Sequence, residues 1–313
     1  MKAPRSGLVA VALLIVYVVW GSTYLGIRVV VEDAPPMSSM GLRFIVAGLL
    51  LGGILIVKNG GLAQFDLSGK QMLGTAFLGL MLPLLGNGLV SVGEHQGATS
   101  GFTALLIAVA PLMIVLFRIA ERDVPRPTTL LGVLLGFVGL AVLVVLGRGA
   151  GDFEVGPALI VLFAASCWAM GSYLQPRLWL PGDPFVVAVW EMLWGGLMMV
   201  AVGALAGERF TFDYPAKTWV AMAYLITFGS VVAFSAYVWL VANAPISLVA
   251  TYAYVNPVIA VFLGWLILDE KITWPIVAGG AIVVAAVALV ITSERKPVAV
   301  APDVPDPEPA NVG

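Results

Sequence analysis

Two charged side chains of opposite sign lie inside long apolar stretches of this sequence. Arg43 lies in the stretch 38–57, and Glu191 lies in the stretch 185–206. If such a stretch spans a bilayer, a charge near its centre costs at least about 2.5 to 3.5 kcal/mol unless it is paired or hydrated. We therefore expect both side chains to face protein or water. They could belong to a solute or proton site, form a structural pair, or snorkel towards the membrane surface.

Carboxyl and imidazole groups at two places could carry protons. Glu191 is the first candidate, because it is the only acidic residue well inside an apolar stretch. Asn87, Ser91 and Glu94 are spaced by four and three residues, so they share one face of a helix that ends at a turn with His95, the only histidine. Glu94 and His95 are the next candidates, although a solvated turn is also an ordinary place for both residue types.

Aromatic and amide side chains recur at helical spacing in two further stretches. Trp20 and Tyr24 are four residues apart near the start of the chain, and so are Tyr252 and Asn256 near its end. A face of this kind could bind an amphipathic or aromatic solute. Tyrosine and tryptophan also anchor helices at membrane interfaces, so both interpretations stay open.

Two prolines lie inside apolar stretches, at Pro111 and Pro257. Pro257 directly follows Asn256, and Pro111 lies in the middle of the stretch 99–117. Proline removes a backbone N–H and frees a carbonyl group of the preceding turn. We therefore predict that both helices bend and gain local polarity there.

The composition indicates what must position these residues. Of the 313 residues, 60% are hydrophobic and 11% are charged, and the mean hydropathy is +1.02, so the chain is an integral membrane protein. A helix that crosses about 30 Å of hydrocarbon needs roughly 20 residues. The apolar stretches lack the strict alternation of apolar and polar residues that barrel strands show, so we expect the spans to be helices. Ten stretches qualify: Leu8–Val31, Ser38–Val57, Gln71–Val92, Thr99–Phe117, Thr128–Leu146, Gly156–Leu174, Phe185–Ala206, Thr218–Ala242, Ser247–Leu268 and Trp274–Thr292.

The two halves of the chain resemble each other. A shift of 148 residues places Trp20 on Trp168 and Arg43 on Glu191, and other matches follow at a shift of 146, including Pro111 on Pro257. We predict two five-helix repeats, 8–146 and 156–292. Because five is odd, the second repeat enters the membrane in the opposite sense, as in transporters that work by alternating access.

The loops predict the orientation. The side that holds the N-terminus carries ten basic residues against five on the other, so we expect both termini in the cytoplasm and the protein in the plasma membrane, in a bacterium the inner membrane. Residues 1–7 are the cytoplasmic N-terminus; the first apolar run is uncleaved. The acidic, Pro-rich segment 293–313 is a disordered tail. The ten basic residues on the side of the N-terminus are Lys2, Arg5, Lys58, Lys70, Arg118, Arg122, Arg126, Arg177, Arg295 and Lys296. The five on the other side are Arg28, Arg148, Arg209, Lys217 and Lys271.

Several function classes are disfavoured by what the sequence contains. One cysteine and one histidine do not favour a disulfide framework, a metal site or a bound cofactor. A net charge of −2 gives no basic stripe for nucleic acid. There is no Gly-Lys-Ser/Thr phosphate loop, no HExxH and no serine with an evident base, so we expect neither an ATP-driven pump nor an enzyme. The expected partners are a small-molecule solute, the lipid bilayer and, if transport is coupled, protons; an oligomer is not required.

Four short segments carry a resemblance to a known family. They are VWGSTY at 19–24, GLRF at 41–44, GNG at 86–88 with EHQ at 94–96, and TYAYVNPV at 251–258. In order and spacing the chain resembles the EamA-type members of the drug/metabolite transporter superfamily, and among them the YedA-type exporters. The resemblance implies ten helices, a central cavity between the repeats, and secondary export of metabolites or drug-like solutes. The resemblance implies an acidic residue after the fourth helix and another after the ninth. Glu270 is in the matching place after the ninth helix, whereas the one after the fourth is displaced here and is found as Glu121, before Asp123.

Secondary export and passive facilitation both remain compatible with the sequence. Without an ATP-binding loop, energy would come from an ion gradient, a solute gradient or a partner. The alternative is a passive facilitator or channel-like uniporter for amino acids or related metabolites. The expected pathway residues are Trp20, Tyr24, Arg43, Asn87, Trp168, Glu191, Tyr252 and Asn256.

Overall fold

The computed structural model describes residues 6–146, 154–244, 249 and 251–293. Within these ranges every regular element is a helix, and nine helices are long and apolar enough to cross a membrane. The tenth, α14 (Tyr252–Leu268), is a shorter apolar helix. The all-helical fold predicted from the sequence is therefore confirmed. Of the tail predicted to be disordered, Ser293 is instead the last residue of α15, and residues 294–313 lie outside the described residues, as do residues 1–5 and Ser247, where the ninth span was expected to begin.

The first repeat forms five spans. The third, fourth and fifth are each made of consecutive helical segments without a long loop between them. The elements are α1 (Ser6–Asp33), α2 (Pro36–Asn59), α3 (Gly69–Gly79) with η2 (Leu80–Gly88) and α4 (Leu89–His95), α5 (Ser100–Ile107) with α6 (Ala110–Ala120), and α7 (Pro127–Ala141) with η3 (Val142–Leu146).

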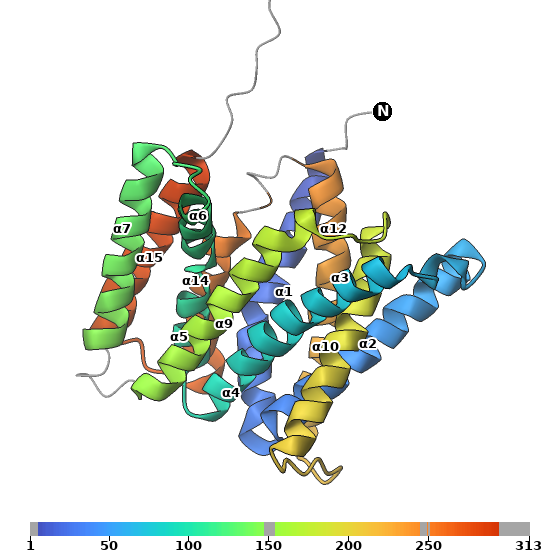
Figure 1. Ribbon diagram of the computed structural model, residues 1–313. Helices are drawn as coiled ribbons and strands as arrows, with labels where there is room; N and C mark the ends of the chain where they lie inside the picture. The colour runs from blue at the N-terminus through green and yellow to red at the C-terminus, as the bar shows by residue number, and fades with distance from the viewer. Residues whose placement is uncertain (1–5, 147–153, 245–248, 250, 294–313) are drawn as a thin grey trace, which may run out of the picture.

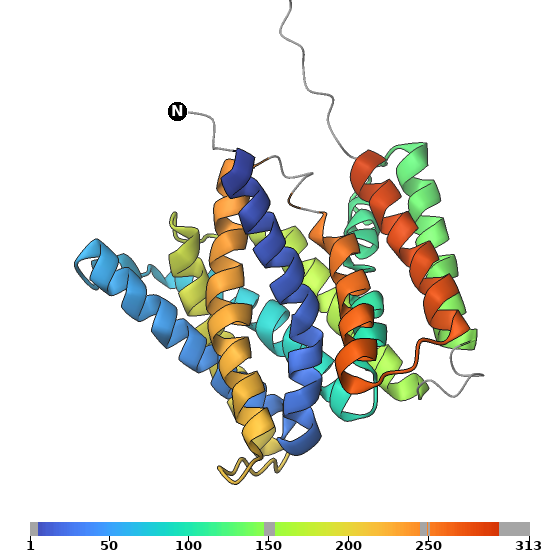
Figure 2. The same cartoon turned by 180° about the vertical axis from the view of Figure 1, so that it is seen from behind.

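The second repeat follows the same order in the opposite direction across the bundle. Its elements are α9 (Val155–Leu174), α10 (Pro184–Leu205), α11 (Ala216–Tyr224) with η5 (Leu225–Val232) and α12 (Ala233–Asn243), α14, and α15 (Trp274–Ser293). The beginning of α1 and the end of α15 lie at the same end of the bundle (Figures 1 and 2). We call this end the terminal face and the other end the opposite face.

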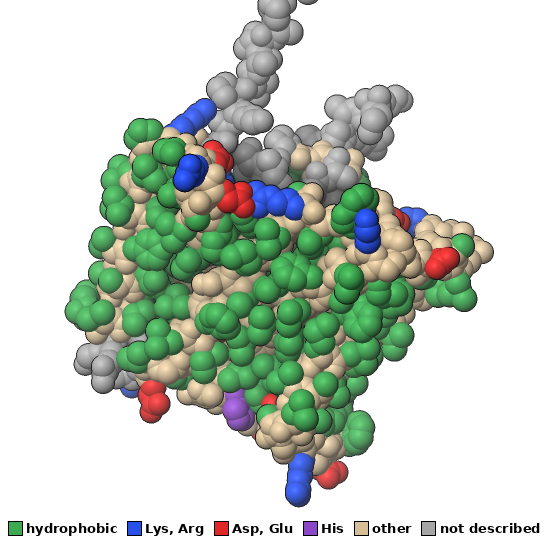
Figure 3. All heavy atoms as spheres, viewed as in Figure 1, with side chains coloured by type: hydrophobic (Ala, Val, Ile, Leu, Met, Phe, Trp, Pro, Cys, Tyr) green, Lys and Arg blue, Asp and Glu red, His purple; other side chains and the backbone are tan. Residues whose placement is uncertain are grey.

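The membrane-spanning surface is visible in the distribution of side chains. Hydrophobic side chains cover the middle of the molecule, while the described charged side chains gather near the two ends (Figure 3). Large apolar residues on this surface are exposed, for example Leu134 at 65% and Val220 at 70%. Exposure on this scale is ordinary where the surrounding solvent is lipid.

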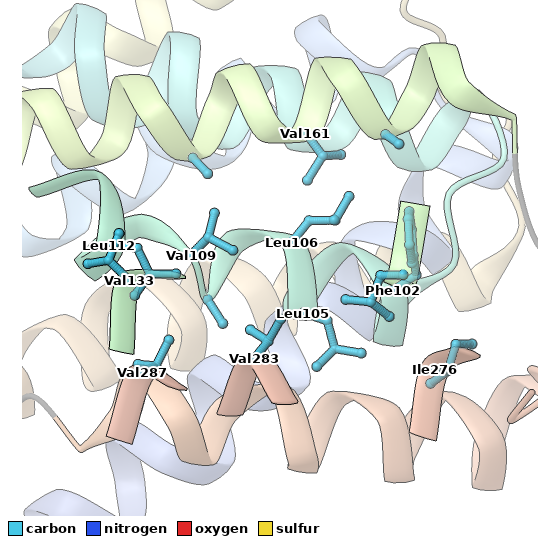
Figure 4. Packing of buried hydrophobic residues seen from close by; sticks show 14 of the residues in the cluster. Phe102, Leu105, Leu106, Val109, Leu112, Val133, Val161, Ile276, Val283 and Val287 are labelled. Atoms are coloured by element: carbon cyan, nitrogen blue, oxygen red, sulfur yellow. The ribbon is translucent and has the colours of Figure 1, made fainter. Parts of the chain in front are cut away.

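Apolar packing fixes the fourth span of the first repeat between two helices of the second. Leu106 and Val109 lie between Val161 of α9 on one side and Val283 and Val287 of α15 on the other (Figure 4). Elsewhere small residues permit closer contact: a Cβ at Gly41 or Gly196 would lie 2.8 Å from the other glycine's carbonyl oxygen, so α2 and α10 touch through their backbones.

Local sequence explains where several helices start. Asp183 caps α10 by accepting a 2.8 Å hydrogen bond from the Phe185 amide, and the Thr99 hydroxyl accepts from the Phe102 amide at the start of α5. Pro111 lies in the first turn of α6, directly after an interruption of the fourth span, whereas Pro257 lies inside α14. Whether either proline bends its helix stays a prediction.

The third span of each repeat contains a π-helical segment in its middle. These segments, η2 and η5, have a wider turn than an α-helix, with hydrogen bonds from residue i to i+5. Pro83 lies within η2. The apolar periodicity does not predict either segment, because π turns break the 3.6-residue repeat.

Candidate solute cavity

A cavity of about 140 Å³ lies between the two repeats. The first four spans of each repeat contribute to its wall. All eight residues predicted to line the pathway border this cavity: Trp20, Tyr24, Arg43, Asn87, Trp168, Glu191, Tyr252 and Asn256. The structure thus brings together residues that lie up to 236 positions apart in the sequence. That they bind a solute remains a prediction.

Arg43 is held in a fixed place at the cavity wall. Its side chain is buried, and its Nε donates a 3.1 Å hydrogen bond to the Ser230 hydroxyl of η5. The guanidinium carbon lies 4.8 Å from the centre of the Phe44 ring, within the range of a cation–π contact. These contacts position the charge without neutralising it.

Glu191 shares the cavity with Arg43 but does not pair with it. Among the described residues, no ion pair joins the two side chains, and the Glu191 carboxylate has no hydrogen-bond partner. The structural pair that the sequence left open is therefore not formed in this structure. Among the described residues that line the cavity, Arg43 and Glu191 are the two with charged side-chain types.

Aromatic rings form a connected wall on the side of α1, α12 and α14. The ring centre of Trp20 lies 5.1 Å from that of Tyr237 and 5.3 Å from that of Tyr252. The Trp20 indole N–H donates to the Gly229 carbonyl of η5 at 3.3 Å. The Trp20–Tyr237 pair is tilted, at 38°, and the Trp20–Tyr252 pair is edge-on, at 81°, so the three rings pack against one another as a unit.

One amide side chain and two hydroxyl groups supply hydrogen bonds at the same wall. With its amide nitrogen turned to satisfy neighbouring acceptors, Asn256 donates to the backbone carbonyls of Tyr252 and Tyr17, each at 3.3 Å. The Tyr17 hydroxyl also forms a hydrogen bond with the Thr251 hydroxyl. These bonds join α14 to α1 beside the cavity.

The structure separates Glu94 from its neighbour His95. Glu94 is fully buried in α4, one turn beyond the cavity-lining Val90, and both carboxylate oxygens lack a hydrogen-bond partner among the described residues. Arg28 donates instead to the Glu94 backbone carbonyl. His95 is exposed, with Nδ1 2.7 Å from the Val31 carbonyl oxygen. Glu94 therefore does not belong to a solvated turn.

Sequence reasoning missed part of the cavity wall. Gly229 and Ser230 belong to η5, and Gly86 belongs to η2, where a Cβ would lie 2.9 Å from the Trp168 ring. Ser230 is a hydroxyl inside an apolar stretch, which is the one signal that could have singled it out. In the described part of the chain, no cluster of three His, Cys, Asp or Glu residues could hold a metal ion.

Outside the spans, Glu121 takes part in a surface cluster at the terminal face. Its carboxylate accepts a 2.7 Å hydrogen bond from the Tyr173 hydroxyl and two from the Arg177 guanidinium, at 2.9 and 2.7 Å. The Tyr173 hydrogen bond first, and then Arg177, hold the pKa of Glu121 below its usual value. The cluster joins the end of α6 to the end of α9.

Comparisons with known proteins agree with this architecture. The profile of the EamA-like transporter family matches residues 7–145 and 156–292. The inner membrane transporter YedA of Escherichia coli K12 is 36% identical over 285 residues, which cover 90% of each chain. The transporter YoaV of Bacillus subtilis is 23% identical, over 88% of this chain and 94% of its own. A solved crystal structure with 18% identity superposes with a TM-score of 0.64, over 93% of this chain and all of the other.

Proposed function

Because the chain belongs to the EamA-like transporter family and is thus a membrane transporter, we propose that it exports small metabolites or drug-like amphipathic solutes by alternating access. The observation that carries this proposal is the cavity between the repeats, with Arg43 and Glu191 on its wall. Its volume of about 140 Å³ is close to that of a cavity that holds benzene, so the solute is small. One chain encloses the site, and no oligomer is required.

The chemistry of the wall suggests the form of the solute. Arg43 suits a carboxylate or another anionic group, and Glu191 suits an amine. The rings of Trp20, Trp168 and Tyr252 suit an apolar or aromatic part. A small solute with an apolar part and at least one charged group matches this arrangement.

We propose Glu191 as the proton carrier of a coupled export cycle. Its carboxylate faces the cavity and has no partner among the described residues, so a solute amine and a proton could occupy it in turn. If this is so, Glu191→Gln will fold and still bind solute, a solute amine more weakly, but will lose the dependence of uphill transport on a pH gradient. Glu154→Gln, a surface carboxylate ahead of α9, is the matched control.

Flux measurements in proteoliposomes, with and without a pH gradient, test this proposal against passive facilitation. A coupled exporter accumulates solute against its gradient when a pH gradient is imposed, whereas a passive facilitator only equilibrates it. Unchanged pH-driven accumulation by a well-folded Glu191→Gln variant would exclude Glu191 as the carrier. Glu94 and His95 would then be tested in the same way. Absence of flux for every small amphipathic solute tried would count against export itself.

We further propose that the terminal face is the cytoplasmic side of a plasma membrane, in a bacterium the inner membrane. Support comes from the ten-to-five excess of basic residues and from the inner-membrane location in the name of the YedA relative. The proposed units are residues 1–7, the repeats 8–146 and 156–292, and the tail 293–313.

A further inference from the structure

Two glutamates at the opposite face make the same set of hydrogen bonds. The Glu208 N–H donates to the Gly203 carbonyl at the end of α10, at 2.9 Å. Its carboxylate accepts the amides of Met37 and Ser38, at 3.1 and 2.7 Å, in the first turn of α2. Glu208 therefore joins the end of a helix in the second repeat to the start of a helix in the first.

Glu270 repeats this arrangement at the end of α14. Its N–H donates to the Gly264 carbonyl at 3.1 Å, and its carboxylate accepts the amides of Ser100 and Gly101 of α5, at 2.7 and 3.2 Å. These amides are among the first of their helix and have no partner within it, so a carboxylate satisfies them and also interacts with the positive end of the helix dipole. We call the two sets of bonds the Glu208 clamp and the Glu270 clamp.

Both clamps depend on the backbone next to the glutamate. The residues directly before the two glutamates are Gly207 and Asp269, and their φ angles are positive, at 80° and 53°. This backbone conformation ends α10 and α14 and turns the chain towards the starts of α2 and α5. A Cβ at Gly203 would lie 2.6 Å from the Ser38 hydroxyl, and a Cβ at Gly264 would lie 2.8 Å from the Ser100 hydroxyl. The glycines thus leave the space in which each carboxylate meets its serine.

The corresponding positions of the first repeat lack the clamp. Gly60 and Arg122 also have positive φ angles, of 74° and 64°, and each precedes its counterpart by 147 positions. The residue after Gly60 is Gly61, which has no side chain to accept a bond. The residue after Arg122 is Asp123, which accepts a 2.7 Å hydrogen bond from Arg118 of its own helix. In the described part of the chain, this bond pattern therefore occurs at the opposite face alone.

The clamped helix starts lead directly to the cavity. Arg43 and Phe44 of α2 line it, five and six residues after Ser38, and Ile107 of α5 lines it seven residues after Ser100. At 1.5 Å per residue these distances along the helix are about 7 to 11 Å. A movement of either helix start away from its clamp would displace these cavity-lining residues.

We propose that Glu208 and Glu270 are the two clamps of a gate that closes the cavity on the opposite face. Both carboxylates must leave their helix starts before a solute can pass there. The gate rests on the proposed alternating-access function, but its closure is a property of the protein without solute. It can therefore be measured separately.

Labelling of one cysteine in the cavity tests the gate. Thr23 lines the cavity, and Cys167 is the only native cysteine, so the reporter is Thr23→Cys in a Cys167→Ala background. Vesicles of both orientations are treated with a membrane-impermeant thiol reagent. With Glu208→Gln and Glu270→Gln combined, we expect labelling from the opposite face to rise about tenfold or more, because charge-assisted bonds are replaced by weaker ones. Labelling from the terminal face should not rise.

Glu154→Gln is the matched control, because Glu154 precedes α9 at the same face and its side chain makes no capping bond. Equal labelling of the clamp variant and this control, with both eluting as folded monodisperse protein, would overturn the gate. If the double variant does not fold, cysteines at Ser38 and Glu208, joined by a short bifunctional reagent, replace it. This crosslink should abolish labelling from the opposite face, and persistent labelling there would equally refute the proposal. Neither result depends on the solute, so a failure of the export proposal would be distinguishable.

Discussion

At the scale of single residues, the positions of charged groups follow from the cost of placing them in lipid. Arg43 and Glu191 both face the cavity, and neither reaches the lipid surface. Both intramembrane charges therefore lie on the cavity wall, and their role in binding a solute stays a prediction. The same reasoning could not separate buried Glu94 from exposed His95, because neighbouring residues at a helix end differ in burial only through the tertiary packing around them.

Arg43→Gln is expected to weaken binding of solutes that carry a carboxylate. The substitution removes a charged donor, and hydrogen bonds to charged groups contribute about 1.5 to 3 kcal/mol, so affinity should fall about tenfold to a hundredfold. Binding to purified protein, measured by calorimetry or by tryptophan fluorescence, reports the change. Lys58→Gln, at the exposed end of the same helix, is the control. Equal affinity of the two variants for every such solute would show that Arg43 does not contact it.

At the scale of helices, the contact between α2 and α10 should be sensitive to a single methyl group. Gly196→Ala places a Cβ 2.8 Å from the Gly41 carbonyl oxygen, and such overpacking costs about 1 to 3 kcal/mol. We expect a lower thermal unfolding temperature in detergent. Gly53→Ala, on α2 with no atom within 4 Å, should leave the temperature unchanged or raise it slightly. A stable Gly196→Ala variant would mean that the two helices can separate without cost.

The surface cluster that joins α6 to α9 gives a pH dependence with a definite sign. Hydrogen bonds from Tyr173 and Arg177 lower the pKa of Glu121 in the folded protein. Its contribution is therefore fully present above the pKa of an unfolded glutamate, about 4.3, and is lost as the pH falls through the folded value. Unfolding temperatures of the native protein and Glu121→Gln should differ slightly at pH 7 and converge as the pH falls below the lowered pKa of the folded protein. A difference that grows on acidification would contradict the assignment.

The elements also show where sequence patterns stop being informative. The number, direction and approximate bounds of the spans follow from hydropathy and from the repeat, because lipid demands about 20 apolar residues in each helix. The π-helical segments were not predicted, since they change the periodicity on which such an analysis depends. The two clamps were not predicted either, because the partners of Glu208 and Glu270 are 169 to 171 positions away.

At the scale of the whole molecule, the orientation in the membrane is the expectation on which the transport direction depends. With the terminal face in the cytoplasm, cysteines placed at Lys2 and Asp306 should react with an impermeant reagent only after the cells are opened. A cysteine at Glu154, at the opposite face, should react in intact cells. Labelling of position 2 or 306 from outside would reverse the orientation and, with it, the side on which the gate opens.

The paired π-helical segments have a consequence for the history of the chain. A π turn holds one residue more than the α turn it replaces, so a single inserted codon in a helix is enough to create it. Because η2 and η5 lie in the third span of both repeats, the simplest order of events places one insertion in an ancestral five-helix protein, before its gene was duplicated. On this account the widened turns predate the duplication, whereas the difference between Arg43 and Glu191 at corresponding positions arose after it.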